Sequence, residues 1–115
     1  MKREYHIYAS SVLVELKTLK ENNKAEYFKE IFMKLMPEIK AYIAAQLKTA
    51  IKKGIVAKNR YKVDDFVNDL YIYVYEHINS IDDSANFYTW LFKQADEILN
   101  DAFTYEEFDD FFFKN

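Results

Sequence analysis

The chain has 115 residues, of which 50% are apolar and 18% aromatic, and a net charge of −3. This length fits one domain with its own hydrophobic core. The absence of cysteine excludes a disulfide framework and a thiolate metal site. With one glycine and one proline, the composition favours helices with short connections over a turn-rich β fold. We therefore predict an all-α protein, a compact bundle of four to five helices.

Neither a secretory leader nor a membrane span is expected. Glu15 and Lys17 interrupt the apolar residues near the N-terminus. No segment approaches the ~18 consecutive apolar residues of a membrane helix. We expect a soluble, cytoplasmic protein with no membrane partner, and the sequence leaves its oligomeric state open.

Charge is segregated along the chain. Residues 48–62 carry six basic residues and no acid, whereas residues 64–110 carry thirteen acids and one lysine, Lys93. The usual explanation of such charges is a solvated surface. An acidic surface would repel DNA phosphates and attract basic protein surfaces. The basic segment is predicted to be a solvated loop, or alternatively a separate nucleic-acid contact.

Two helical patterns occupy the first half of the chain. Apolar side chains of the first pattern recur at steps of three and four, and a polar stop at residues 21–23 ends it: Tyr5, Tyr8, Val12, Leu16 and Leu19. The second pattern forms one apolar stripe: Phe28, Ile31, Phe32, Leu35, Ile39, Tyr42, Ile43 and Leu47. Pro37 lies inside this stripe, so it predicts a bend or two shorter helices.

Two further helices are predicted in the second half. The third spans about residues 64–78 with one apolar side: Phe66, Val67, Leu70, Val74, His77 and Ile78. N-cap candidates at residues 80–84 precede the fourth, whose stripe is Phe87, Trp90, Leu91, Ala95, Ile98, Leu99 and Ala102. We expect the stripe of the fourth helix to pack on Leu70 and Val74 in the core.

The predicted organisation has three parts: an N-terminal helix at residues 1–24, a helical domain at 25–103 and an acidic aromatic tail at 104–115. Thr104 and Glu107 have capping-box spacing, which predicts one last short helix. The aromatic residues of the tail either cap the bundle or form a segment that docks a partner or masks the third helix.

No catalytic set can be assembled, so an enzyme is not expected, and no cofactor is predicted. His6 and His77 are far apart in the sequence, and the single glycine excludes a phosphate-binding loop of the usual kind. Asp64, Asp65 and Asp69 cluster without a histidine at Glu-x-x-His spacing and without an EF-hand glycine. No metal site is therefore predicted.

A longer motif remains in residues 63–101. Its first half reads Val-Asp-Asp-Phe-Val-Asn-Asp-Leu-Tyr, and its second half contains Trp-Leu-Phe-Lys-Gln-Ala-Asp-Glu. In this order and at this separation the two halves resemble region 2 of the sigma-70 family of bacterial transcription initiation factors. The family's typical text is Glu-Asp-Leu-Val-Gln-Glu-Val-Phe followed by Trp-Leu-x-x-Ile-Ala-Arg-Asn. The resemblance covers about residues 27–103 and implies a small helical bundle.

The first half of the motif matches the family's polymerase-docking helix. Asp65 matches its aspartate, while Asn68 and Asp69 stand for its glutamine and glutamate. The resemblance implies that this helix binds the clamp helices of the RNA polymerase core. Residues at steps of three and four would form its exposed face: Asp65, Asn68, Asp69, Ile72 and Glu76.

The second half departs from the family where DNA would bind. Asp96 and Glu97 occupy the arginine and asparagine positions. Single-stranded DNA binding needs a positive groove with stacking aromatic residues. Tyr88 and Phe92 are candidates for stacking and Lys93 for a phosphate contact, so promoter binding is expected to be weak.

The sequence therefore predicts a divergent sigma region 2-like domain that binds RNA polymerase core. The alternative is an acidic helical interaction module that regulates a protein partner without direct DNA binding. The helix-turn-helix of sigma region 4 is not among these residues, so either the chain is part of a longer protein or promoter reading has been lost. A further helix-turn-helix would favour the first prediction.

Overall fold

The computed structural model describes residues 3–82 and 86–113, with side chains for residues 11–82 and 86–107. The described residues form five α-helices: α1 (Arg3–Glu21), α2 (Ala25–Met33), α3 (Pro37–Lys52), α4 (Val63–His77) and α5 (Phe87–Phe113). A single 3-10 turn, η1 (Ile78–Ser80), follows α4. The prediction of an all-α bundle is confirmed. No helix in these ranges is both long and apolar enough to cross a membrane.

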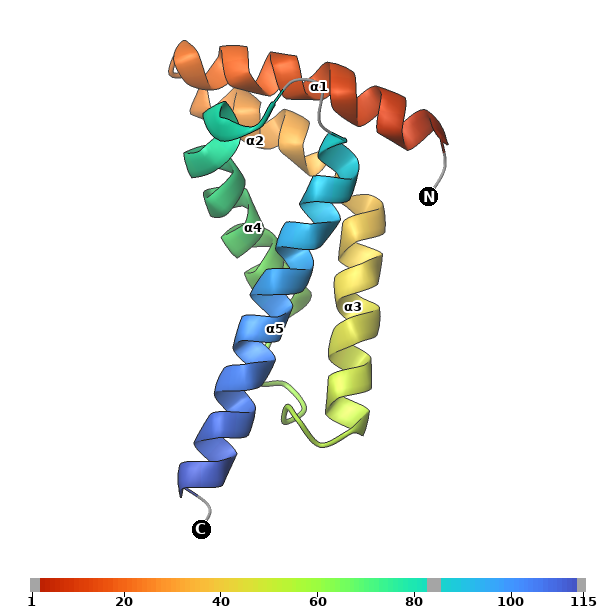
Figure 1. Cartoon of the computed structure of the whole chain (residues 1–115), viewed down its shortest axis with the longest axis vertical. Coiled ribbons are helices and arrows are strands. Elements are labelled where there is room, and N and C mark those ends of the chain that lie inside the picture. The colour runs from red at the N-terminus through yellow and green to blue at the C-terminus, as the bar shows by residue number, and fades with distance from the viewer. Residues whose placement is uncertain (1–2, 83–85, 114–115) are drawn as a thin grey trace.

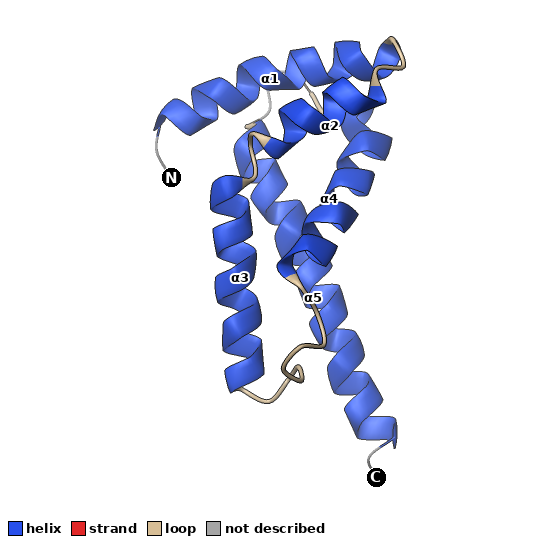
Figure 2. Ribbon diagram, turned by 180° about the vertical axis from the view of Figure 1, so that it is seen from behind, coloured by secondary structure: helices blue, strands red, loops and turns tan. Residues whose placement is uncertain are grey.

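Three helices run along the length of the molecule and two lie across one end. In Figure 1, α3, α4 and α5 descend through the molecule, and α1 and α2 lie side by side across their upper ends. Figure 2 shows the same arrangement from behind. The helix α5 contacts α1, α3 and α4 and is the centre of the fold. Because α1 and α5 project beyond their neighbours, the radius of gyration is 15.9 Å, above the about 13 Å of a spherical domain of this length.

The helices α1 and α3 are each followed by a residue with a left-handed backbone conformation. Asn23 has φ 58° and Gly54 has φ 76°. After each of them, the next backbone N–H closes the helix, from Lys24 to the carbonyl of Leu19 (2.8 Å) and from Ile55 to that of Ala50 (3.0 Å). These are Schellman motifs, in which asparagine or glycine tolerates the left-handed position. The predicted stop at residues 21–23 is thereby confirmed.

Pro37 divides the second predicted pattern into two helices. It is the first residue of α3, where its missing N–H is harmless and its fixed φ favours the helix. In the link at residues 34–36, Lys34 is exposed, but Leu35 and Met36 are both buried. The apolar stripe thus continues through the break and joins α2 and α3 to one core.

All five helices and the α3–α4 loop contribute to a single core among the described side chains. Its fully buried members include Leu13 of α1, Phe28 and Phe32 of α2, Ile43 of α3, Leu70 of α4 and Leu91 of α5. The predicted stripes of α4 and α5 both enter this core, with Trp90 and Ile98 only partly buried. The side chains of Tyr5, His6 and Tyr8 lie outside the described residues.

The prediction that His77 belongs to the apolar side of its helix is wrong. Its side chain is exposed in the last turn of α4. The ring stacks on Tyr73 with centroids 4.1 Å apart, and its Nδ1 lies 2.9 Å from the Tyr73 carbonyl oxygen. Ile78, the next residue, is the one that is buried.

The fourth predicted helix begins at Phe87 and is longer than expected. Asn86 caps it, because its Oδ1 accepts the backbone N–H of Thr89 at 3.1 Å. Cap candidates Asp83 and Ser84 lie outside the described residues. A new helix does not begin at Thr104, since α5 continues without interruption to Phe113. The tail side chains from Phe108 onward are also outside the described residues.

Candidate functional site: the acidic face of α4 and the groove beside it

The five residues predicted for the partner-binding face of α4 are all exposed. We call this set the acidic face: Asp65, Asn68, Asp69, Ile72 and Glu76. The buried residues of α4 lie on its other side: Phe66, Val67, Leu70 and Val74. Ile72 is 45% exposed. An aliphatic residue in the middle of carboxylates gives this face a charged border and an apolar centre.

Asp65 also has a structural role at the start of α4. Its Oδ2 accepts the backbone N–H of Lys62 at 3.0 Å, directly before α4 begins. This is the reciprocal half of a capping box, and the carboxylate also lies at the positive end of the helix dipole. Asp65 therefore supports the start of α4, so Asp69 and Glu76 are the better residues for testing binding.

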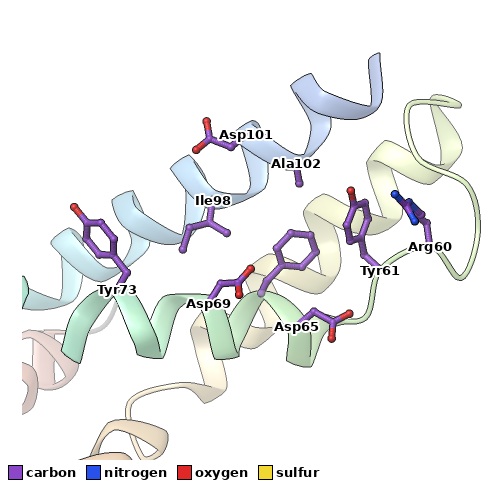
Figure 3. A pocket seen from close by; sticks show the side chains of 9 residues that line it. Arg60, Tyr61, Asp65, Asp69, Tyr73, Ile98, Asp101 and Ala102 are labelled. Carbon is purple, nitrogen blue, oxygen red and sulfur yellow. The ribbon is translucent and has the colours of Figure 1, made fainter. Parts of the chain in front are cut away.

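A groove of about 680 Å³ lies between α4 and α5 and borders the acidic face. We call it the α4–α5 groove. Residues from α4, α5 and the preceding loop line it: Arg60, Tyr61, Asp65, Phe66, Asp69, Tyr73, Ile98, Asp101 and Ala102. Figure 3 shows Ile98 and Ala102 pointing from α5 toward α4, with Asp65 and Asp69 along the opposite wall. The lining thus combines an apolar strip with carboxylates from both helices.

At one end of the groove, an ion pair joins the α3–α4 loop to α5. Glu106 Oε1 accepts hydrogen bonds from Arg60 Nε at 2.9 Å and from the Tyr61 hydroxyl at 2.6 Å. Burial raises the pKa of Tyr61, and its hydrogen bond to the Glu106 carboxylate raises it further. The Arg60 charge is therefore already balanced by Glu106, and Asp65, Asp69 and Asp101 make the groove negative.

The predicted basic loop is attached to the bundle at several points. The helix α3 extends to Lys52, so the loop spans only residues 53–62. Val56 is buried in the core, and the Tyr61 ring packs on Phe66 with centroids 5.4 Å apart. The tail residue Glu106 binds this loop, so the described part of the tail does not cover the acidic face of α4.

The two aromatic DNA-binding candidates, Tyr88 and Phe92, lie on the other side of α5, facing α3. Tyr88 is completely buried, and its hydroxyl donates to Glu38 Oε2 at 3.2 Å. The half-buried Phe92 ring packs against Tyr88 and Tyr42, with centroid distances of 5.3 Å and 5.5 Å. Tyr88 therefore has no free face for a base in this structure, which removes it as a stacking candidate. Phe92 is largely engaged in the α3–α5 contact.

The charges beside these aromatic residues do not form a phosphate site. Lys93 is exposed, but Asp96 and Glu97 follow it on α5. Asp96 Oδ1 accepts the Tyr42 hydroxyl at 2.6 Å. This hydrogen bond raises the pKa of Tyr42, with smaller contributions from burial and from the Asp96 charge. The residue at the family's arginine position is thus used to join α3 to α5.

Sequence reasoning missed the α5 wall of the groove. Asp101 appeared only as one of many acids, and Ile98 and Ala102 only as members of an apolar stripe. Their position opposite Asp69 depends on how α4 and α5 cross. Among the described residues, no group of three or more His, Asp or Glu side chains is placed to hold a metal ion.

Comparison with known proteins gives no family for this chain. No protein-family model, no curated protein and no solved structure matches it.

Proposed function

We propose that this chain is a divergent sigma region 2-like domain that binds the RNA polymerase core, at the clamp helices, through the acidic face of α4. The observation that supports this most directly is the exposure of all five residues at the positions that the resemblance implies for polymerase contact. Their charge suits a basic helical partner, and the exposed Ile72 supplies an apolar centre. Apart from Asp65, which caps α4, the described part of the chain gives these residues no structural role.

Promoter DNA is a weak partner in this proposal. The side of α5 that would face a melted strand presents Asp96 and Glu97 beside a single lysine, Lys93. Fixed negative charge opposes phosphate binding. Burial of Tyr88 removes one of two stacking rings, and stacking supplies about 1–3 kcal/mol per base in single-strand binding proteins.

The test is a binding titration with the clamp-helix fragment of RNA polymerase from the same organism. The double variant Asp69→Lys/Glu76→Lys reverses two exposed charges on the acidic face. It should weaken binding at least about tenfold, because like charges would then oppose each other across the interface. Circular dichroism should show unchanged helix content, since exposed charges contribute little to stability.

A matched control reverses two exposed glutamates elsewhere. Glu15→Lys/Glu30→Lys changes the net charge by the same amount, on α1 and α2, and should bind as the wild type does. Equal weakening by both double variants would mean that net charge, and not the acidic face, governs binding. Wild-type affinity in Asp69→Lys/Glu76→Lys would contradict the proposal.

A second candidate function is an acidic helical interaction module with a different protein partner. The use of Asp96 and Tyr88 in internal hydrogen bonds favours it, because the surface through which the family binds DNA is here part of the bundle. The two functions separate in the same titration. An interaction module would fail to bind the clamp fragment while remaining folded.

A further inference from the structure

The α4–α5 groove has a length and spacing that fit an α-helix. Asp65, Asp69 and Tyr73 follow one another at four-residue steps along its α4 wall, which makes that wall about 12 Å long, or two helical turns. Ile98 and Ala102 are likewise four residues apart on α5 and point toward α4 (Figure 3). Side chains at positions i and i+4 of a helix lying in the groove would meet this apolar strip.

The charges around the groove determine which helix it would accept. Asp69 lines the groove from α4 and Asp101 lines it from α5, with the Asp101 carboxylate at the outer edge of α5, pointing away from α4 (Figure 3). No hydrogen bond or ion pair is found for either one within the described residues. Arg60 is the one basic side chain in the lining, and Glu106 already binds it. A groove with two carboxylate walls favours a ligand with positive charge on both flanks and disfavours nucleic acid.

Tyrosine side chains lie at both ends of the groove, and the one at the far end from the loop suits the same ligand. Tyr61 lies at the loop end, and Tyr73, 36% exposed, lies at the other. The Tyr61 ring already has Arg60 over it, 5.4 Å from its centroid, so Tyr73 is the tyrosine that can attract a lysine or arginine side chain of the ligand. Tyrosine is also enriched where proteins bind one another. Tyr73 is held in place by stacking on His77 and by contact with Trp90, at centroid distances of 4.1 Å and 6.0 Å.

We infer that the α4–α5 groove binds a basic amphipathic helix of a protein partner. Aliphatic side chains of that helix lie on the strip of Ile98 and Ala102, and its lysine or arginine side chains lie beside Asp69 and Asp101. The inference rests on the proposed function for the identity of the partner, the clamp helices of RNA polymerase. It extends the contact from the exposed face of α4 to α5, whose Asp101 is not among the residues that the resemblance implies for polymerase contact.

Two substitutions on α5 test the groove without touching Asp69 or Glu76. Ala102→Phe fills the apolar strip, and Ala45→Phe, at an exposed position of α3, is its control. Asp101→Lys reverses a charge of the α5 wall, and Glu15→Lys is its control. Ala102 is partly buried, so circular dichroism accompanies each variant, and the exposed Asp101 keeps the test valid if Ala102→Phe unfolds.

Two probes are titrated against each variant: the clamp-helix fragment, and a synthetic amphipathic helix of about 18 residues with leucines at i and i+4 flanked by lysines. A peptide with glutamate in place of lysine is the negative control. We expect Ala102→Phe and Asp101→Lys each to weaken binding of the clamp fragment and of the lysine peptide at least about tenfold. The two control variants should bind as the wild type does.

The outcomes separate the groove from the proposed function. If the clamp fragment binds all groove variants equally but not Asp69→Lys/Glu76→Lys, the function stands and the groove inference is overturned. If the clamp fragment does not bind, but the lysine peptide binds the wild type and binds the groove variants more weakly, the groove inference is supported and the polymerase is excluded as the partner. If the wild type binds neither probe, the inference is overturned. It is also overturned if sedimentation analysis shows that a second copy of the chain occupies the groove, as a dimer that the groove variants disrupt.

Discussion

The acidic residues at the contact of α5 with α3 differ in role from those at the contact of α5 with α4. Toward α3, Asp96 accepts the hydroxyl of Tyr42, and Glu38 accepts that of Tyr88, so each carboxylate serves the packing of two helices. Toward α4, Asp101 and Asp69 border an open groove with no hydrogen bond between them. A carboxylate that already holds an internal tyrosine contributes to stability, whereas one on an open groove remains available to a partner.

The open side of α5 still rests on a packed core, and Leu70 tests this. Leu70→Ala removes a fully buried side chain from α4 and should lower the free energy of unfolding by about 2–5 kcal/mol. Ile72→Ala, two residues away on the acidic face, should change it by only about 0.5 kcal/mol. Urea denaturation of both variants measures the difference. A loss below about 1 kcal/mol for Leu70→Ala would show that α4 is not packed as described.

The contrast between Asp96 and Asp101 can be measured directly, because both are aspartates on one helix. Asp96→Ala removes the acceptor for the Tyr42 hydroxyl and should be less stable than Asp101→Ala by about 1 kcal/mol. The gain in helix propensity is the same for both replacements, so it cancels. Chemical denaturation at neutral pH is the measurement. Equal stability of the two variants would mean that Asp96, on the α3 side of α5, contributes no more to stability than Asp101 does.

A smaller effect is expected at alkaline pH. The Asp96 hydrogen bond holds the pKa of Tyr42 above its ordinary value of 10.0. The unfolded chain therefore loses this proton first, and stability that is fully present below about pH 10 falls as pH rises through the folded-state pKa. Tyr42→Phe should make the free energy of unfolding decline less steeply above pH 10 than it does in the wild type. Denaturation curves at a series of pH values provide the measurement, and identical slopes would contradict it.

Much of the fold followed from local pattern. The break at Pro37, the stop at residues 21–23 and the buried stripe of α5 are fixed by side chains within a few residues of one another. The exposed set on α4 was predictable for the same reason, since helical periodicity alone separates Asp69 from Leu70. Errors of local reading occurred at helix ends, where His77 was assigned to the core and Thr104 to a new helix.

The rest depended on contacts between distant segments. Tyr88 follows Phe87 directly but is not itself a member of the predicted stripe. Its hydroxyl can be buried because it donates to Glu38, 50 residues earlier in the sequence. The α4–α5 groove likewise required the crossing of two helices, which brings Asp101 opposite Asp69. Helical periodicity describes one helix at a time, so it could not place either feature.

The position of α1 has a consequence for the order of events during synthesis. Lys17 donates to the carbonyl of Ile81, which lies 64 residues later, and α1 packs against α5 as well as against its neighbour α2. Since α1 leaves the ribosome well before α5, it cannot complete its packing until α5 has emerged. Until α5 emerges, α1 and α2 can pack against each other, because their connection is short, but the α5 side chains that complete the core are missing. The bundle can therefore close only after α5 has left the ribosome, even though α1 and α2 are made much earlier.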